Sequence, residues 1–272
     1  MQDVGCRMFR HSASGIFFCA PVWFMRRGLL PLIIAVFTTG AFAPAPQAQT
    51  KKVLYVTHSA GYKHDVLPLS EKILAEVGRA HGFEVATTGD ASTITAKSLE
   101  PFSAVVFYTT GELPMSDEQK SAFMAWIRSG RGFVGIHSAT DTFYKWPEYG
   151  EMIGGYFDEH PWNTRVAMKV EDHDHPSTKH LGATWSLADE IYQFKNYSRA
   201  DKRVLLSLDV SSVDLNVKGV KRADRDFANA WYKSWGSGRV FYTALGHRPE
   251  VWQDPAYQQH LAGGITWAMG AK

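Results

Sequence analysis

Residues 130–141 (Gly-Arg-Gly-Phe-Val-Gly-Ile-His-Ser-Ala-Thr-Asp) constrain the fold more than any other part of the chain. The apolar run 133–136 predicts a buried parallel strand, and the small residues after His137 allow a tight turn into the next element. Such a turn places one side chain at the carboxyl edge of the sheet, where open α/β folds carry their sites. Nucleophile-elbow enzymes have Ser or Cys at this point, whereas this chain has His137. Histidine indicates metal binding or proton transfer, and the alternative is a histidine that is only hydrogen-bonded at the strand end.

The first 49 residues have the pattern of a presequence. Met25-Arg26-Arg27 precedes an apolar run over 28–43, and Pro, Ala and Gln fill residues 44–49, which is the order of a secretory signal. The apolar run of roughly 16 residues is shorter than the roughly 20 that a membrane span needs. We therefore expect a cleaved signal and a periplasmic or extracellular protein. An uncleaved anchor is the alternative and would be the chain's membrane contact; Met25 is a candidate true start.

Residues 50–272 are long enough for one sizeable α/β domain. Both cysteines, Cys6 and Cys19, lie in the presequence, so the remaining chain has no disulfide, thiolate ligand or cysteine nucleophile. Four of the 29 basic residues and one of the 27 acidic residues also lie there, which leaves the domain close to neutral. This balance gives no electrostatic indication of nucleic-acid binding.

Apolar runs and helical periodicity alternate along the first half of the domain. Strands are expected over 52–57, 83–87, 104–108 and 133–136, and helices over 66–81 and 116–129, an order that implies a parallel sheet. The second half is β-rich over 164–170, 184–187, 204–209 and 229–234, which suggests an antiparallel extension, before a buried strand from 238 and a helix over 255–269. We predict a single α/β domain with a mostly parallel sheet and helices on both faces.

Polar side chains follow the predicted strands. Because the carboxyl ends of parallel strands meet at one edge, these residues are expected to share a site. They are His58, Tyr62 and His64 after the first strand, Glu112 after the third, His137 and Asp141 after the fourth, and His247 and Arg248 after the last. Two clusters, 158–160 with His160 and 189–190 with Glu190, could join them. Imidazoles with a carboxylate suit zinc, nickel, iron or manganese, but no short-range motif identifies the ligands.

Other histidines and the tryptophans carry weaker signals. His173 and His175 are predicted in an exposed loop, and His81 and His260 on helices, where structural or solvated roles are expected. Trp126 and Trp267 have core spacing. Three tryptophans are predicted in loops near the edge of the sheet, where they would either stack on a sugar ring or act as packing lids: Trp146, Trp162 and Trp252.

Five motifs, at 61–65, 132–141, 154–160, 189–192 and 238–247, closely resemble those of the ThuA-like, trehalose-utilisation family, in order and over 52–270. The resemblance implies a class I glutamine amidotransferase-like, flavodoxin-like fold and frequent secretion beside sugar oxidoreductases that make keto-sugars. It also implies the polar positions His64, His137, His160, Glu190 and His247. One departure is the absence of a proline just before Trp231. Glutaminase activity is excluded, since that chemistry needs a cysteine where His137 stands.

Three functions remain open. The leading hypothesis is a secreted enzyme, a hydrolase, lyase or isomerase, acting on a keto-glycoside. Its assigned groups are metal ligands His64, His137, His160 and His247; catalytic groups His137, Glu190 and Asp141; and substrate-binding groups His58, Tyr62, Glu112, Trp146, Trp162 and Arg248. No nucleotide cofactor is indicated. The alternatives are a non-catalytic sugar-binding module and a structural partner of a sugar oxidoreductase.

Overall fold

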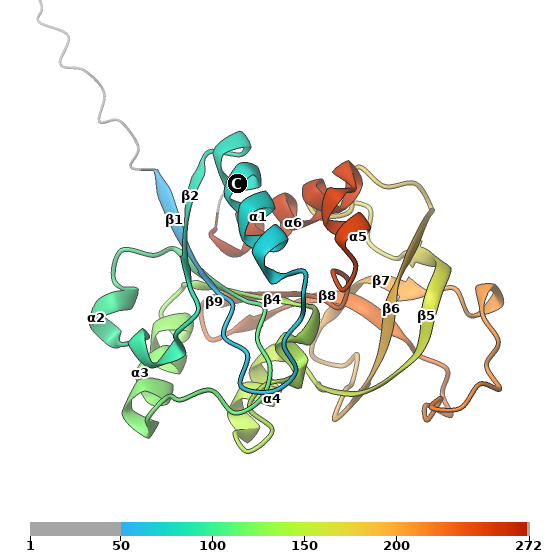
Figure 1. Cartoon of the computed structure of the whole chain (residues 1–272), viewed down its shortest axis with the longest axis horizontal. Helices are drawn as coiled ribbons and strands as arrows, with labels where there is room; N and C mark the ends of the chain where they lie inside the picture. Colours follow the sequence, from blue (N-terminus) through green and yellow to red (C-terminus); the bar gives the residue numbers. More distant parts are fainter. Residues whose placement is uncertain (1–49, 271–272) are drawn as a thin grey trace, which may run out of the picture. The chain divides into compact units, whose positions relative to one another are not determined.

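One nine-stranded sheet organises residues 50–270, the part of the chain that the computed structural model describes. The predicted secretory signal lies outside the described residues. The strand order is β2-β1-β3-β4-β9-β8-β7-β5-β6 (Figure 1). The first five strands in this order run parallel to one another: β2 (Phe83–Thr88), β1 (Lys51–Val56), β3 (Ala104–Phe107), β4 (Gly132–Ile136) and β9 (Gly238–Thr243). The other four pair in antiparallel fashion: β8 (Ala228–Trp235), β7 (Arg203–Leu208), β5 (Tyr156–Val170) and β6 (Thr184–Lys195).

The predicted antiparallel extension is present, but it is larger than expected, so the sheet is about half parallel and not mostly parallel. Parallel pairing ends at β9, and every pairing beyond it is antiparallel. The antiparallel strands are also longer than predicted, since β5 and β6 begin or continue beyond 164–170 and 184–187 and include the motif residues 158–160 and 189–192. Register shifts near Glu159 interrupt the alternation of β5, which explains why the sequence pattern hid this part of the strand.

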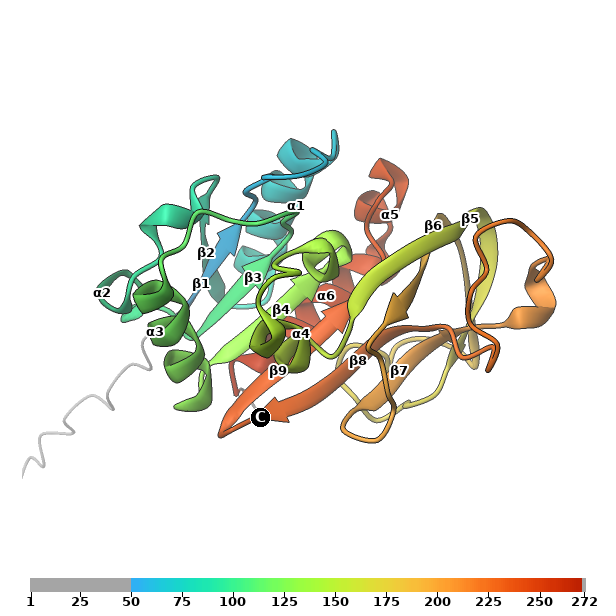
Figure 2. The same cartoon turned by 90° about the horizontal axis from the view of Figure 1, so that it is seen from below.

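Helices cover both faces of the parallel strands, as predicted. On one face lie α1 (Leu67–Ala80), α5 (Pro249–Gln253) and α6 (Pro255–Ala268), and on the other α2 (Ala96–Leu99), α3 (Asp117–Arg128) and α4 (Pro147–Ile153) (Figures 1 and 2). Among the helices of residues 50–270, none combines the length and apolar character that crossing a bilayer requires.

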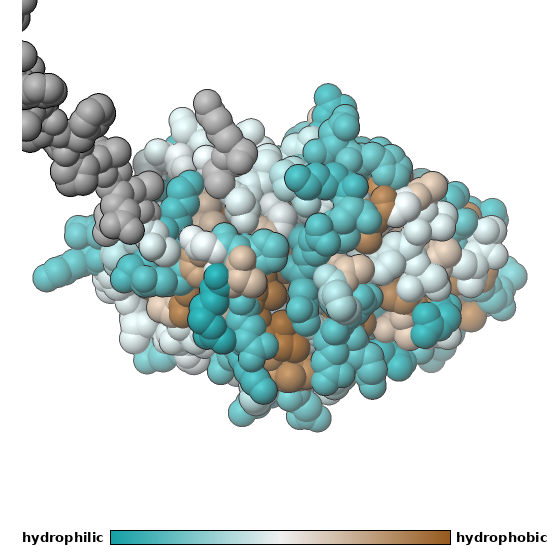
Figure 3. Space-filling model, turned by 90° about the horizontal axis from the view of Figure 1, so that it is seen from above, coloured by the Kyte–Doolittle hydropathy of each residue, from teal (hydrophilic) through white to brown (hydrophobic). Residues whose placement is uncertain are grey.

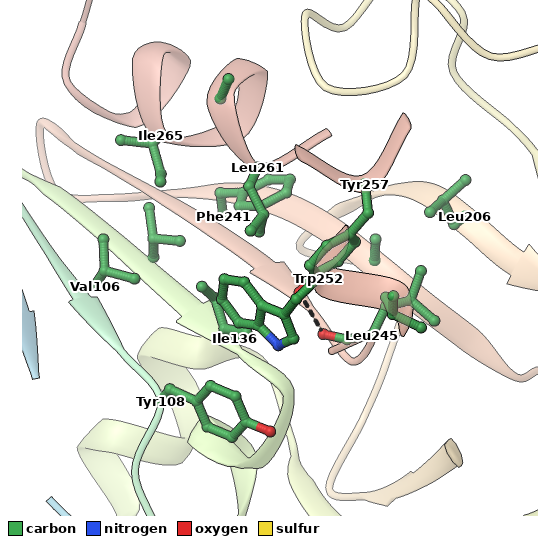
Figure 4. Close-up of a cluster of buried hydrophobic side chains, with 14 of the residues drawn as sticks. Val106, Tyr108, Ile136, Leu206, Phe241, Leu245, Trp252, Tyr257, Leu261 and Ile265 are labelled. Carbon is green, nitrogen blue, oxygen red and sulfur yellow. Dashed lines mark hydrogen bonds between the residues drawn. The ribbon is translucent and has the colours of Figure 1, made fainter. Parts of the chain in front are cut away.

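Alternation along the strands divides the core into two layers. In β3, Val106 faces the layer under α1 and α6, whereas its neighbour Phe107 faces the layer over α3. The first layer is drawn in Figure 4, where Trp252 and Tyr257 lie against the carboxyl ends of the strands and the Tyr257 hydroxyl donates to the carbonyl of Leu245 at 2.8 Å. Apolar packing thus continues up to the edge where the candidate site lies.

Candidate functional site

His137 occupies the turn directly after β4. A short 3₁₀ helix, His137–Asp141, follows the strand, and the φ of His137 is +46°, an uncommon left-handed value for a residue other than glycine. Its ring is fully buried, and Nδ1 lies 2.7 Å from the carbonyl oxygen of Ala244. Because a carbonyl only accepts, Nδ1 carries the proton. Nε2 therefore keeps the lone pair, and the strained turn aims it into the site.

Two further histidines converge on this nitrogen. His64 comes from the segment between β1 and α1, and His247 from the segment between β9 and α5. One ligand atom of each of the three imidazoles lies within 4.8 Å of the other two, and His137 Nε2 is 3.3 Å from His247 Nδ1. The predicted convergence of these three histidines at the carboxyl edge of the parallel strands is therefore what the structure has.

Burial keeps the deepest two imidazoles neutral. Desolvation, with a smaller contribution from His247, lowers the pKa of His64 to about 4. Complete burial, with a contribution from His64, lowers the pKa of His137 well below its ordinary value. At neutral pH both rings are uncharged and offer lone pairs, the state in which histidine binds metal ions.

Glu190 on β6 connects the histidines. Its Oε2 lies 3.6 Å from His137 Nε2 and 3.4 Å from His247 Nδ1, and its Oε1 lies 3.5 Å from His160 Nδ1. The carboxylate side chain is only 10% exposed, whereas that of His160 is 44% exposed. Glu190 thus reaches the buried centre with one oxygen and a solvent-facing imidazole with the other.

These donors fit a divalent metal ion. Zinc–nitrogen bonds of about 2.0–2.1 Å place tetrahedral ligand atoms about 3.3–3.4 Å apart. The 3.3 Å separation of His137 Nε2 from His247 Nδ1 is close to this value, and Glu190 Oε2 lies beside both nitrogens at 3.6 and 3.4 Å. One competitor is present, because the Tyr192 hydroxyl lies 3.0 Å from His137 Nε2 and donates to the same lone pair. Three imidazoles and a carboxylate suit zinc, iron, manganese or nickel.

A pocket of about 350 Å³ opens beside His64 and His247. Tyr62 stands at it with 65% of its surface exposed, edge-on to the His64 ring at a centroid distance of 4.8 Å. Arg248 also lines the pocket, and its Nε donates to Asn163 Oδ1 at 3.1 Å. Predicted binding residues Tyr62 and Arg248 therefore lie at the histidine cluster. The face of the molecule drawn in Figure 3 is largely hydrophilic, with small apolar areas between the polar ones.

Several predicted site residues make their contacts elsewhere. The carboxylate of Asp141 accepts from the Tyr144 hydroxyl at 2.7 Å, and burial raises its pKa. The Nδ1 of His58 accepts from the backbone of Ala91, and Glu112 accepts from the backbone of Lys145. No hydrogen bond or ion pair in the described part of the chain links these three residues to the histidines; their assigned roles stay predictions.

The tryptophans expected in loops at the edge are packed instead. Trp162 is a buried residue of β5 whose Nε1 donates to the carbonyl of Asp214. Trp252 lies on α5, fully buried and stacked on Tyr108. Trp146 directly precedes α4 and packs against Phe143. Of the two expectations, packing rather than sugar stacking describes Trp162 and Trp252.

His175 also differs from its prediction. It is buried, stacked on Tyr232, and not in an exposed loop, because residues 171–183 pack onto α6. His260 is fully buried on α6, as a structural role requires, and His81 is exposed after α1.

Sequence reasoning missed two neighbours of Glu190. Tyr192 contacts His137, and Asp189 accepts from the backbone of Gly246 at 2.7 Å. Burial raises the pKa of Asp189 to about 7. The available signal was the motif Asp-Glu-Ile-Tyr itself: alternate residues of a strand share a face, so Tyr192 had to accompany Glu190.

The fold defines a class of protein. The structure is an α/β domain whose fold resembles that of the class I glutamine amidotransferases, and His137 stands at the turn after β4. A putative GMP synthase protein from Thermoplasma acidophilum has the same fold, at a TM-score of 0.51 and 12% identity over 82% of this chain and 96% of its own.

Residues 52–268 match the family model ThuA, described as trehalose utilisation, and the chain belongs to this family. A putative ThuA-like protein from Bacteroides uniformis superimposes with a TM-score of 0.70 at 26% identity, covering 83% of this chain and 95% of its own. Another, from Parabacteroides merdae, gives 0.63 at 20% identity over 82% and 91%. A comparison with curated proteins gives no match.

Proposed function

We propose that this protein is a secreted carbohydrate-active enzyme that uses a divalent metal ion bound by His64, His137 and His247 and acts on a keto-glycoside. The observation that carries the proposal is the convergence of three histidines and one buried carboxylate beside a pocket of about 350 Å³. A pocket of this size suits a small ligand. The family description, trehalose utilisation, supports a sugar as that ligand.

The bound ion would supply Lewis-acid polarisation of a sugar carbonyl, which acidifies the neighbouring C–H bond and permits isomerisation or elimination as well as hydrolysis. Glu190 is not a metal ligand in this proposal but the general base, since its Oε2 lies 3.6 and 3.4 Å from two of the three imidazoles, within reach of a substrate at the ion. His160, on the other oxygen of Glu190 and 44% exposed, passes the proton to solvent.

Substrate binding is assigned to the pocket residues. The exposed ring of Tyr62 offers an apolar face to a pyranose, while Arg248, whose guanidinium is held by Asn163, offers hydrogen-bond donors to hydroxyl groups. Export to the periplasm or outside the cell, and supply of the keto-sugar by a partner oxidoreductase, complete the proposal; the signal-like order of residues 1–49 and the family resemblance support them.

The first test is elemental analysis of residues 50–272, exported and purified without chelator or a polyhistidine tag. We expect near-stoichiometric zinc, nickel, iron or manganese, lost in His137→Ala and His64→Ala and retained in His173→Ala, which removes a histidine outside the cluster. Turnover is then assayed on keto-glycosides made by oxidising glucosides and trehalose. Absence of metal after incubation with each ion would end the metal-dependent mechanism.

A non-catalytic sugar-binding module is the second candidate, favoured by the exposure of Tyr62 at the pocket. It predicts saturable sugar binding that survives chelator, is weakened by Tyr62→Ala, and forms no product. The enzyme hypothesis predicts instead that chelator abolishes turnover and that added metal restores it.

A further inference from the structure

We infer that Asp189 is a positioning residue that fixes His247 by accepting hydrogen bonds from the backbone N–H groups on both sides of it. The inference rests on the proposed function, because a fixed His247 matters most if this imidazole holds a metal ion. Asp189 itself touches none of the three histidines through its hydrogen bonds, which all go to main-chain N–H groups.

The position of Asp189 beside this backbone follows from the geometry of β6. Successive residues of a strand point to opposite faces, so Asp189 and Glu190 approach the β9–α5 segment from different sides. Glu190 Oε2 lies 3.4 Å from the imidazole of His247. Asp189 Oδ2 accepts from Gly246 N at 2.7 Å and its Oδ1 from Arg248 N at 3.2 Å. One carboxylate thus contacts the side chain of His247 and the other the backbone before and after it.

The other bonds of this segment use the N–H of Ala244, which donates to Asn229 O, and several of its carbonyls. Ala244 O accepts from His137 Nδ1, and Gly246 O accepts from Trp252 Nε1 at 2.7 Å and from the Tyr108 hydroxyl at 3.0 Å. The N–H groups of residues 246 and 248 donate to Asp189 instead. His137 is bonded to the same segment. A displacement of the segment would therefore change the distance between His137 and His247.

A purely structural role does not explain a carboxylate at this point. Asp189 is fully buried, and within residues 50–270 no Lys, Arg or His forms an ion pair with it. Burying a carboxylate without a cationic partner is costly, and the backbone donors offset only part of that cost, since the pKa of Asp189 stays raised to about 7. Accurate placement of a metal-ligating imidazole is a benefit that such an arrangement supplies.

The test measures Co²⁺ binding by the full domain, residues 50–272, using the visible absorption of the bound ion. Asp189→Asn keeps the shape of the side chain but directs an amide N–H₂ at one of the two backbone donors. We expect Co²⁺ affinity to fall by about 10- to 100-fold, the usual effect of removing a group that orients a metal ligand, with a changed absorption spectrum.

Asp172→Asn is the control for the chemical change alone. The Oδ1 of Asp172 accepts from the backbone N–H groups of Asp174 and His175, in a segment that contributes nothing to the site. Because one oxygen accepts both bonds, the amide oxygen of asparagine can keep them, so this variant should leave Co²⁺ affinity and spectrum unchanged. Wild-type Co²⁺ affinity in Asp189→Asn, or an equal loss in Asp172→Asn, would overturn the inference.

A metal-free measurement separates this inference from the proposed function. In the wild type, the amides of Gly246 and Arg248 should exchange slowly with solvent, and Asp189→Asn should accelerate them and shift the His247 imidazole resonances. If the wild type binds no Co²⁺ but shows these effects, the metal proposal fails and the positioning role stands. If the two wild-type amides exchange as fast as unprotected ones, the positioning role fails, whether or not the variant folds.

Discussion

At the scale of single residues, the site depends on how the two nitrogens of His137 are used. Nδ1 is committed to the carbonyl of Ala244, which fixes the tautomer, and Nε2 faces Tyr192, His247 and Glu190. The left-handed φ of +46° is the conformational cost of this orientation. A histidine that merely satisfied a strand end would need only the first of these bonds, so the second nitrogen is the functional one.

Tyr192→Phe tests whether Nε2 of His137 is a metal ligand. In the metal-free protein the hydroxyl donates to this nitrogen, and a metal ion must displace it. Removing a hydrogen bond worth about 1 kcal/mol should tighten metal binding by about 5-fold. Competition with a chromophoric chelator measures the change, with Tyr144→Phe as a control because its hydroxyl binds Asp141. Weaker binding in Tyr192→Phe would mean that the hydroxyl supports the ion.

Polar residues that follow parallel strands were expected to meet at one edge of the sheet. This strand-end rule predicted which segments reach the site but not which way each side chain points. His64, His137 and His247 follow β1, β4 and β9 and converge as expected. His58 also follows β1, yet its ring accepts from Ala91 in the connection after β2. The rule places the backbone, whereas local hydrogen bonding decides where a polar side chain goes, and a single sequence does not reveal that choice.

At the scale of elements, the β9–α5 segment is held in one conformation by close packing and buried hydrogen bonds. Gly246 has a φ of +121°, and a Cβ added there would lie 2.5 Å from the Tyr257 hydroxyl. That hydroxyl is already committed to the carbonyl of Leu245, so it cannot withdraw without losing a buried hydrogen bond. The glycine is therefore required by both backbone conformation and space.

Gly246→Ala should destabilise the domain by about 3 kcal/mol, combining backbone strain with overpacking. Gly82→Ala is the control: its φ is +77°, but a Cβ there meets nothing within 4 Å, so only strain of about 1 kcal/mol is expected. Urea denaturation of both variants measures the difference. Equal losses would show that the segment relaxes away from Tyr257.

The elements themselves were predictable to different degrees. The parallel half was predicted well because α1, α3 and their flanking strands show clean periodicity, and the capping box of Ser116 and Gln119 marks the start of α3. The antiparallel half was predicted only in part. Bulges near Glu159 break the alternation of β5, and the polar residues of β6 that form the site interrupt its apolar pattern. The strands that carry the site were therefore harder to predict, because their site residues break the apolar pattern of a strand.

At the scale of the whole molecule, neutral histidines are buried in two separate places. Besides His64 and His137 in the site, burial lowers the pKa of His175 to about 4 and that of His260 to about 3. Within residues 50–270 the Nε2 atoms of His175 and His260 have no hydrogen-bond partner. Protonation would place an unpaired charge inside the core, so acid should destabilise the metal-free domain well before most carboxylates titrate.

The direction in which stability changes with pH follows from the number of protons that the folded and unfolded states bind. Between pH 6.5 and about 4 the unfolded chain protonates these four histidines while the folded chain does not, so stability is complete above pH 6.5 and falls as the pH falls. Asp189 opposes the trend, because burial raises its folded pKa to about 7, and Asp141 is raised as well. Four groups against two leave a net loss of stability with acid.

We expect the free energy of unfolding in chelator to fall by about 3 kcal/mol from pH 6.5 to pH 5, at up to about 1.4 kcal/mol per pH unit for each net proton. His260→Gln keeps a donor for Ser177 O but does not titrate, so the slope against pH should flatten by about one proton. His81→Gln, at an exposed position, should leave it unchanged. Urea denaturation at half-unit pH steps measures all three slopes. If His260→Gln keeps the pH slope of the wild type, His260 has the same pKa in the folded and unfolded states. The folded domain would then open enough to hydrate this histidine.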